Sequence, residues 1–325
     1  MAVSAAAWFL PEPEVSVADL PVPDGTERHT VGRLGIDTIR ADDRMDAVQL
    51  GECAARRVLE RAGADAGELG ALIVVESRAP DTFLSSEATR LQRLLGADAA
   101  LTFTVGGLGC VSITPALFAA RGLLAADPDL GDVLVVHGSK PVSSVRYRHP
   151  VTVSGDGGQA LLLSRGGPVR ILDIAQRSNG QHWNLFHVKY RDRPTAQWRE
   201  ECEDPSVYSF RLAIETRNAL SGLLAEVLER NGLGKGDIRG HLSHNLSAGS
   251  LAFTEDALGI GLLPVCRENL RRYGHLGPND VFLNLYTALE RGELAPGDHV
   301  VLINASPVAA WSVVLVRIGP QEAVV

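Results

Sequence analysis

Short hydrophobic runs alternate with amphipathic stretches along the whole chain. Runs bounded by glycine, proline or acidic residues predict buried strands at 71–77 (ALIVVES), 133–136 (VLVV), 160–164 (ALLLS), 169–175 (VRILDIA), 241–247 (HLSHNLS) and 299–304 (HVVLIN). The stretches between them have the spacing of helices with one buried face. Strands that alternate with helices predict a mostly parallel sheet covered by helices, an α/β fold.

The pattern occurs twice. Residues 58–63 read VLERAG and residues 227–232 read VLERNG, 169 positions later, and each copy leads through a Gly/Asp loop into a strand. Gly131-Asp132 and Gly297-Asp298 both open apolar strands at a similar offset. Because VLER is a common helical string, chance similarity is the alternative, but the shared order of elements favours a duplication. The Gly/Pro break after Ser164 divides the chain into halves 1–165 and 166–325.

One segment, 176–208, has no counterpart in the first half. It is polar, aromatic and poorly periodic. Two interpretations stay open, an excursion that shapes a substrate entrance and a surface loop without a role in substrate choice.

Composition narrows the class of protein. The chain has 325 residues, of which 45% are hydrophobic and 22% charged, and a net charge of -8 without a Lys/Arg cluster. These values indicate a globular protein and argue against a nucleic-acid or membrane surface. Four separated cysteines form no C-x-x-C motif, the first residues do not resemble a signal peptide, and no apolar run reaches the ~18 residues of a membrane span. We therefore expect a cytoplasmic protein with free thiols.

Cys110 is the strongest candidate for chemistry. The sequence 102–126 runs from a strand through a glycine-rich turn into an amphipathic helix, and Cys110 lies at the first turn of that helix. Helix N–H groups and the helix dipole stabilise a thiolate there. A lone cysteine is more often a small core residue, but the glycine turn at Gly106, Gly107 and Gly109 favours a nucleophile.

The duplication suggests partners for Cys110. At an offset of 170 Cys110 falls on Asp280, and the strand with Val75 falls on the strand with His244. If the halves pack about a pseudo-twofold axis, His244 and Asp280 approach Cys110 from the second half. We predict a nucleophile, a base and an acid that orients the base, the arrangement for acyl transfer through a thioester.

Four segments together resemble ketosynthase III proteins of the thiolase superfamily: GGLGCVS (106–112), SGDGGQA (154–160), HLSHNLS and the run from Tyr273 to Ile303. The resemblance covers nearly the whole chain in the right order. It implies the thiolase fold, with duplicated βαβαβαββ halves in a five-layered αβαβα arrangement. It also implies catalytic roles for Cys110 and His244, with His241 as a weaker competitor, and a homodimer joined along 100–105.

Three departures from that family concern the reaction. Condensing members have an asparagine where this chain has His275, and that asparagine helps to stabilise the enolate of a decarboxylated malonyl thioester. Pro307 lies in the loop that supplies an oxyanion-binding N–H, so Ser306 or Val308 would have to replace it. Residues 245–249 lack the arginine that docks an acyl carrier protein.

The motif HLGPND at 275–280 is similar to the HLGxxD motif of a side branch that acylates hydroxyls or amines in natural-product pathways. We therefore expect acyl transfer from a coenzyme A or acyl-carrier-protein thioester through Cys110, His244 and Asp280 to a small-molecule acceptor, without a bound cofactor or metal. His275, Asn245 and Ser306 are the expected substrate-binding residues. A helix N-cap is the other interpretation of Asp280. A decarboxylating condensing enzyme and a non-catalytic partner subunit are the alternative functions.

The remaining candidates receive structural interpretations. His137 ends a predicted strand and is interpreted as a core or strand-end histidine. Trp311 is interpreted as a packing residue, and Trp8, Trp183 and Trp198 are weak candidates for a pocket wall. Cys53, Cys202 and Cys266 are given no chemistry.

Overall fold

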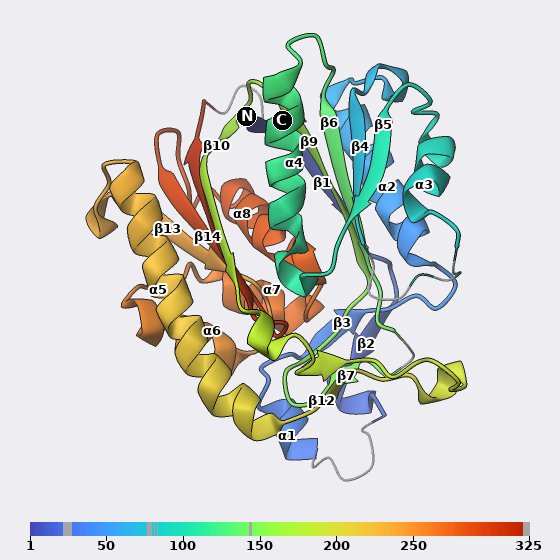
Figure 1. The fold of residues 1–325 in the computed structure, drawn as a ribbon, viewed down its shortest axis with the longest axis vertical. Coiled ribbons are helices and arrows are strands. Elements are labelled where there is room, and N and C mark those ends of the chain that lie inside the picture. The colour runs from blue at the N-terminus through green and yellow to red at the C-terminus, as the bar shows by residue number, and fades with distance from the viewer. Residues whose placement is uncertain (22–27, 77–79, 81, 83, 143–144, 321–325) are drawn as a thin grey trace.

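The computed structural model of the protein describes residues 1–21, 28–76, 80, 82, 84–142 and 145–320. Strands and helices alternate through both halves of the chain (Figure 1). The elements of the first half are β1 (Ala2–Phe9), β2 (Glu14–Ser16), η1 (Val17–Asp19), α1 (Arg28–Gly32), β3 (Thr38–Arg40), α2 (Ala47–Ala62), η2 (Ala66–Glu68), β4 (Ala71–Val75), α3 (Glu87–Leu95), β5 (Leu101–Val105), η3 (Gly109–Ser112), α4 (Ile113–Ala126), β6 (Val133–Ser139), β7 (Tyr147–Arg148), β8 (Thr152–Val153) and β9 (Gly157–Ser164).

The second half begins after the turn that follows Ser164. Its elements are β10 (Val169–Ser178), η4 (Gly180–His182), β11 (Phe186–His187), η5 (Thr195–Gln197), β12 (Glu201–Cys202), the π-helical turn η6 (Val207–Leu212), α5 (Ala213–Arg230), η7 (Lys235–Asp237), β13 (Ile238–Ser243), α6 (Ala248–Leu258), α7 (Val265–Tyr273), η8 (Gly277–Asn279), α8 (Asp280–Glu290), β14 (His299–Ser306) and β15 (Ala310–Ile318).

The sheet topology confirms the predicted duplication. Among the described residues, nine strands form one sheet in the order β13-β14-β15-β10-β1-β9-β6-β4-β5. Outward from the centre, β10, β15, β14 and β13 repeat the order and the strand directions of β1, β9, β6 and β4. The two half-sheets join through a short antiparallel pairing of β1 with β10. The VLERAG and VLERNG strings end the equivalent helices α2 and α5.

Local sequence signals mark both ends of α2. Asp46 and Gln49 form a capping box at the start of α2, and Gly63 closes that helix in the left-handed conformation. The predicted boundary between the halves falls in the turn between β9 and β10.

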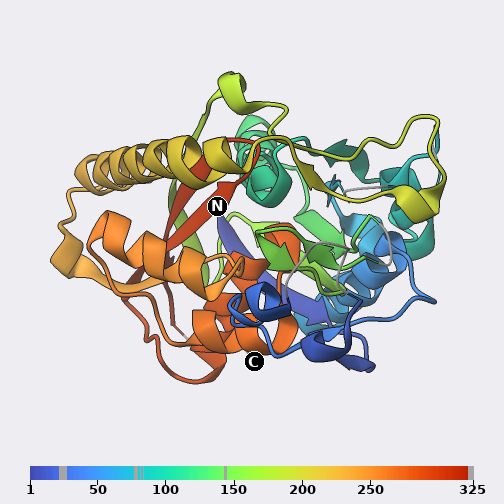
Figure 2. The same cartoon turned by 90° about the horizontal axis from the view of Figure 1, so that it is seen from below.

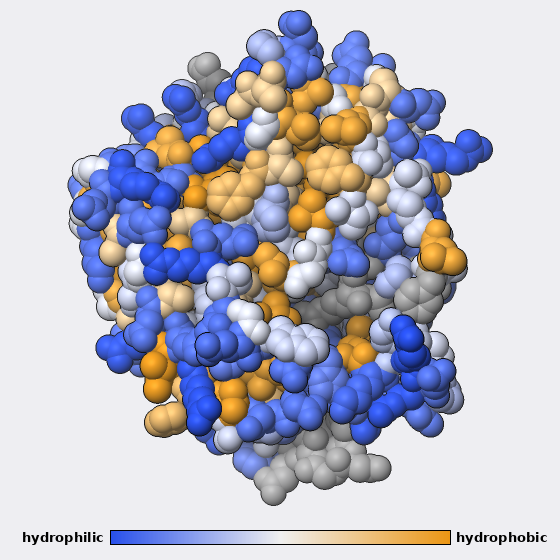
Figure 3. All heavy atoms as spheres, viewed as in Figure 1, coloured by the Kyte–Doolittle hydropathy of each residue, from blue (hydrophilic) through white to orange (hydrophobic). Residues whose placement is uncertain are grey.

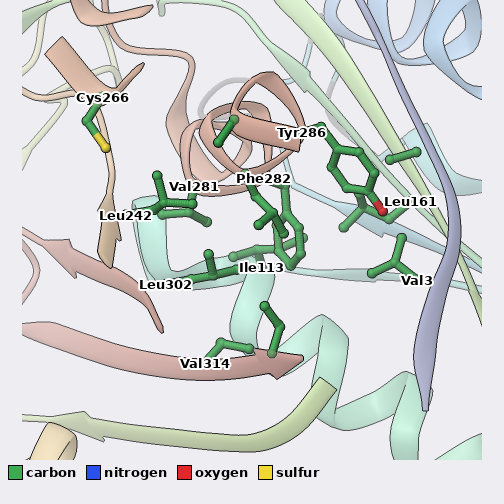
Figure 4. Close-up of a cluster of buried hydrophobic side chains, with 14 of the residues drawn as sticks. Val3, Ile113, Leu161, Leu242, Cys266, Val281, Phe282, Tyr286, Leu302 and Val314 are labelled. Carbon is green, nitrogen blue, oxygen red and sulfur yellow. The ribbon is translucent and has the colours of Figure 1, made fainter. Parts of the chain in front are cut away.

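Three hydrophobic clusters separate five layers. A central cluster contains side chains of α4 and α8 together with the inner faces of both half-sheets. Figure 4 shows part of this cluster, in which Ile113 of α4 and Phe282 of α8 lie close to Leu302 of β14. A second cluster packs α2 and α3 on the outer face of the first half-sheet, and a third packs α5 on the second. Figure 2 shows α5, in gold, along the outside of the molecule. This is the expected thiolase arrangement.

One helical stretch corrects an expectation. Gly109–Ala126, which comprises η3 and α4, is apolar and long enough to cross a membrane by length and composition, although no such run was expected. Half of it is buried in the protein. A core helix meets the same criterion, and α4 occupies the central layer.

Candidate active site

The nucleophile candidate lies between the two half-sheets. Cys110 is fully buried in η3, directly before α4, as the predicted strand–turn–helix order requires. Gly109 precedes it with φ +54°, and a Cβ atom there would lie 2.6 Å from Ser306 Oγ. Only glycine fits this turn without strain, because both the backbone angle and the space exclude a side chain. The Asn304 side chain donates to the Cys110 carbonyl and ties the turn to β14.

The His275 ring contacts Cys110. Its Nε2 lies 3.0 Å from Cys110 Sγ. The backbone holds the ring in place, since the His275 N–H donates to the Val153 carbonyl and the Gly155 N–H donates to the His275 carbonyl. The ring is 1% exposed. At this distance Nε2 can take the thiol proton, so His275 contacts the nucleophile itself, and its expected substrate contact stays a prediction.

Asp280 completes a three-residue relay. Its Oδ2 accepts a hydrogen bond of 2.6 Å from His275 Nδ1, and it also accepts one from the Asn245 N–H. Its Oδ1 accepts from the Leu276 N–H. The carboxylate therefore points back towards His275 and not along α8, where a helix cap would point, and Asn279 occupies the formal N-cap position. The N-cap interpretation of Asp280 does not fit this geometry.

The expected pairing of Asp280 with His244 is wrong. His244 lies near the site, with its ring centroid 6.5 Å from that of His275, but Asp280 bonds to His275. Burial, and then the nearby His275, lower the pKa of His244 to about 3. A histidine with that pKa is neutral at physiological pH and too weak a base to collect a proton from an alcohol. The duplication correctly predicted that His244 lies near the centre of the molecule, but burial lowers its pKa and makes it a weak base.

Asn245 and Ser306, the other two expected substrate-binding residues, differ in their relation to the cavities near the site. Asn245 is fully buried and supports the relay, because its N–H holds Asp280 and its Oδ1 accepts from Asn284. It does not line either of the cavities described below, so the expected substrate contact is corrected to a supporting role. Ser306 lines both cavities, and its Oγ accepts from the Val308 N–H at 3.5 Å. Its expected substrate contact stays a prediction.

Two cavities share the wall residues Ser306 and Pro307, and the first of them is also lined by Gly109, which precedes Cys110. The first, of about 280 Å³, is called the charged cavity here, and it is lined by Gly109, Ser112 and Gly277 together with Glu76, His137, Ser139, Lys140, Arg148, Phe186, His187 and Glu200. The second, of about 220 Å³, is called the α5–α6 cavity, and its walls include Tyr208, Leu212, Leu220, His244, Leu246 and Phe253. The segment 176–208 contributes to both cavities, which favours the substrate-entrance interpretation over a passive loop.

Several wall residues of the charged cavity were not recognised from the sequence. His137 was interpreted as structural, and Arg148 and Glu200 were not singled out. Arg148 is 2% exposed, and its Nε lies 2.5 Å from Glu200 Oε2. Glu200 belongs to the segment without a counterpart, so the repeat offered no signal for it. Trp183 is 74% exposed and lines neither cavity, whereas Trp311 is buried, as expected of a packing residue.

The SGDGGQA turn holds the backbone that pairs with His275. Asp156 is fully buried and accepts hydrogen bonds from Arg146 and Lys140 and from the Asp42 N–H. This network fixes the strand that pairs with His275 at Ser154. The turn therefore acts as a structural element, as its resemblance implies.

Comparisons with known proteins show what this chain is similar to. The family description "3-Oxoacyl-[acyl-carrier-protein (ACP)] synthase III C terminal" matches residues 228–318. A beta-ketoacyl-[acyl-carrier-protein] synthase III of Pectobacterium atrosepticum is 28% identical over 95% of this chain and 96% of its own length. The chain is therefore similar to ketosynthase III proteins over nearly its whole length.

Solved structures show the same fold. ChlB3, described as an acyltransferase, superposes on this protein with a TM-score of 0.83 at 23% identity, over 99% of this chain and 98% of its own. The 3-oxoacyl-(acyl carrier protein) synthase III of Pseudomonas aeruginosa PAO1 has a TM-score of 0.80 at 22% identity, with 98% of each chain covered. Both condensing and acyl-transferring proteins thus share this architecture, and the reaction has to be inferred from the site.

Proposed function

We propose that the protein is an acyltransferase that moves an acyl group from a coenzyme A or acyl-carrier-protein thioester, through Cys110, to a hydroxyl or amine of a small-molecule acceptor. The observation that carries this proposal is the relay in which Cys110 Sγ, His275 and Asp280 are joined by contacts of 3.0 and 2.6 Å. Such a relay activates a nucleophile and then activates the acceptor with the same base.

In the first half-reaction Cys110 is acylated. His275 Nε2 takes the thiol proton, and the thiolate attacks the thioester carbonyl. The carbon–sulfur bond to the donor breaks, and His275 returns the proton to the departing thiol. Asp280 holds Nδ1 protonated, which leaves the lone pair of the neutral ring on Nε2, the atom that faces Sγ.

In the second half-reaction the acceptor takes the acyl group. Its hydroxyl or amine attacks the acyl-Cys110 carbonyl while His275 removes the proton. The new bond to oxygen or nitrogen forms, the bond to Sγ breaks, and the proton passes from His275 to the thiolate. One base thus serves both halves of a ping-pong cycle.

The same geometry argues against condensation. In the condensing relatives that this chain resembles, a histidine and an asparagine stabilise an enolate together. Here the asparagine position holds His275, whose two ring nitrogens face Sγ and the Asp280 carboxylate. A base engaged in this way is suited to removing a proton from an acceptor and not to donating a hydrogen bond to an enolate. The similarity to beta-ketoacyl-[acyl-carrier-protein] synthase III proteins favours condensation as the second candidate.

We assign His244 the role of a neutral hydrogen-bonding group. It lines the α5–α6 cavity, and its pKa of about 3 keeps the ring uncharged in the working range of pH. A neutral imidazole carries one N–H, which can bind a carbonyl oxygen. It could therefore assist the oxyanion, for which the Pro307 position offers no N–H.

The test uses malonyl coenzyme A and acetyl coenzyme A as donors, with intact-mass spectrometry and a carbon dioxide assay. An acyltransferase shows a malonyl or acetyl adduct on Cys110, no adduct in Cys110→Ala, and no carbon dioxide release. Release of carbon dioxide in step with product would establish the condensing reaction. An adduct that persists in Cys110→Ala, or no adduct with any thioester, would remove the proposal. A cytoplasmic location and a natural-product acceptor belong to the same proposal.

A further inference from the structure

A third hollow lies beside β1, at the place where the two half-sheets part. Strand β1 pairs with β10 only at its first residues, whereas β9 accompanies it to its end. Beyond the pairing with β10, Arg61 of α2 donates to the Ala6 carbonyl. Beside Arg61 is a cavity of about 250 Å³, called the β1 pocket here. Its apolar walls are small side chains, namely Ala5, Ala6, Ala62, Ala64, Leu162 and Pro168.

The β1 pocket is remote from the acyl relay. Asp132, which lines the pocket, directly precedes β6, whereas His137, further along the same strand, lines the charged cavity. At the rise of a β-strand, these five positions separate the two walls by roughly 16 Å. The pocket also shares no wall residue with the charged cavity or with the α5–α6 cavity. A ligand bound there is therefore not in contact with Cys110.

Tyr286 of α8 brings a buried hydroxyl to the β1 pocket. The residue is 4% exposed, and its hydroxyl has no hydrogen-bond partner among the described residues. Figure 4 shows this hydroxyl pointing towards Val3 and Leu161, and the residues that follow these two, Ser4 and Leu162, line the pocket. Burying a hydroxyl without a partner costs free energy. A ligand that accepts a hydrogen bond from Tyr286 would remove this cost.

Arg61 adds a positive charge close to that hydroxyl. Burial raises the pKa of Tyr286, and the charge of Arg61 acts against this rise, so the guanidinium lies near the phenol. The phenol therefore keeps its proton at neutral pH and can donate it to a ligand. Arg61 uses Nη1 for the Ala6 carbonyl and has no ion pair with any described residue. A phenol and a guanidinium together are suited to binding a carboxylate.

Asp132 provides the opposite charge. Its side chain is partly buried in the pocket wall and forms no ion pair with Arg61 or with another described residue. Arg61 also borders a wider groove, whose walls include Glu60 and Glu290. These carboxylates repel a ligand that is only anionic, whereas Asp132 attracts an ammonium group. The charges of the pocket are therefore best matched by a ligand that carries both a carboxylate and an ammonium group.

We propose that the β1 pocket binds a small aliphatic α-amino acid. The Tyr286 hydroxyl and the Arg61 guanidinium donate hydrogen bonds to its carboxylate, and its ammonium group faces Asp132. Its side chain packs on the alanine and leucine walls. The volume of about 250 Å³ suits such a ligand, because pockets for larger, drug-sized molecules have about 300–1,000 Å³. The inference is independent of the proposed acyltransferase function, since no residue of the relay lines the pocket.

The test uses three probes with one carbon skeleton, titrated into the full chain by calorimetry. L-Valine carries both charges, 3-methylbutanoate lacks the ammonium group, and 2-methylpropylamine lacks the carboxylate. Tyr286→Phe removes only the hydroxyl, and Asp132→Asn removes only the negative charge. Tyr147→Phe is the matched control, because Tyr147 is also buried but bonds to His149 and does not line the pocket.

We expect the wild type to bind L-valine more tightly than either of the other two probes. Tyr286→Phe should weaken the binding of L-valine and of 3-methylbutanoate on the order of tenfold, the loss of about one hydrogen bond to a charged group. Asp132→Asn should weaken the binding of L-valine alone, and Tyr147→Phe should leave all three affinities unchanged. Equal affinities of the wild type for L-valine and 3-methylbutanoate, or an unchanged affinity of Tyr286→Phe for L-valine, would overturn the inference.

Urea unfolding shows whether Tyr286 has a merely structural role. Without ligand, Tyr286→Phe should unfold at the urea midpoint of the wild type or above it, because the removed hydroxyl has no internal partner. Millimolar L-valine should raise the midpoint of the wild type and of Tyr147→Phe more than that of Tyr286→Phe. A lowered midpoint of Tyr286→Phe without ligand, or no shift of the wild type with L-alanine, L-valine or L-leucine, would also overturn the inference.

Discussion

Replacing Asp280 by asparagine changes one oxygen of the relay into an NH₂ group, and neither orientation of the amide preserves the site. If the NH₂ faces His275, Nδ1 must become the acceptor, the ring proton moves to Nε2, and the base can no longer take the Cys110 proton. If the NH₂ faces the Leu276 N–H, two donors oppose each other in a fully buried position.

Each orientation has a measurable effect, the first on the reaction rate and the second on the free energy of unfolding. The first removes a positioned general base, which contributes on the order of 10²–10⁴-fold in rate. The second leaves a buried donor unsatisfied, at about 1–3 kcal/mol of unfolding free energy. Because His275 contacts Cys110 and also has to activate the acceptor, we expect Asp280→Asn to slow acylation and deacylation alike, each by about 10² or more.

Stopped-flow release of nitrophenolate measures acylation, and quenched intact-mass time courses measure deacylation. Urea unfolding shows how much stability is lost. Asp298→Asn is a matched control, since Asp298 accepts from the Ala295 N–H in a turn ahead of β14 and lines neither cavity. Rates within twofold of wild type in both steps would refute the relay. Slowing of deacylation alone would mean that Asp280 supports a base other than His275.

Three further predictions concern acylation, acid sensitivity and assembly. Cys110→Ala should gain no acyl mass from any thioester, while Cys266→Ala, which removes another buried thiol, should still be acylated. Because the pKa of buried His244 is lowered to about 3, the unfolded chain binds one more proton than the folded chain below pH ~6.5. The free energy of unfolding should therefore fall by about 2 kcal/mol between pH 7 and pH 5. In urea unfolding, the free energy of unfolding of His244→Gln should fall correspondingly less over the same range. Light scattering should give twice 34.7 kDa, the mass of a homodimer. The reason is that β5 forms an exposed edge of the sheet and that apolar side chains gather over this face, where Leu101 is 53% and Phe118 42% exposed (Figure 3). Leu101→Glu should shift the mass towards the monomer, and a monomeric wild type would contradict the dimer.

The alternation of strands and helices and the repeat predicted an α/β fold with two equivalent halves, and the family resemblance implied its five layers. The strings at 58–63 and 227–232 mark equivalent helix ends because each half needs the same helix to cover the same strands. The halves differ where the repeat fails. Beyond β4 the first half-sheet has β5, and β13 has no such neighbour in the sheet of the described residues. The segment 176–208 likewise had to be seen in three dimensions.

The site was predicted only in part, and for a physical reason. Sequence position brought His244 correctly to the centre, but a sequence does not reveal burial, and burial is what deprives His244 of basicity. The useful signal was local: His275 and Asp280 are five residues apart across a glycine–proline turn, close enough to bond without help from the rest of the fold.

The duplication also explains how a buried relay with two acidic groups is stabilised. Cys110 lies in η3 at the start of α4, and Asp280 lies in the first turn of α8, at equivalent positions of the two halves. The N-terminal end of a helix favours negative charge. A pseudo-twofold axis thus directs two positive helix ends at one point, where one favours a thiolate and the other a carboxylate. His275 lies between the two anions, and when it holds the proton its single positive charge reduces the net charge of the group from −2 to −1. Asp280→Asn removes one of these charges, which is why its effect should extend to both half-reactions.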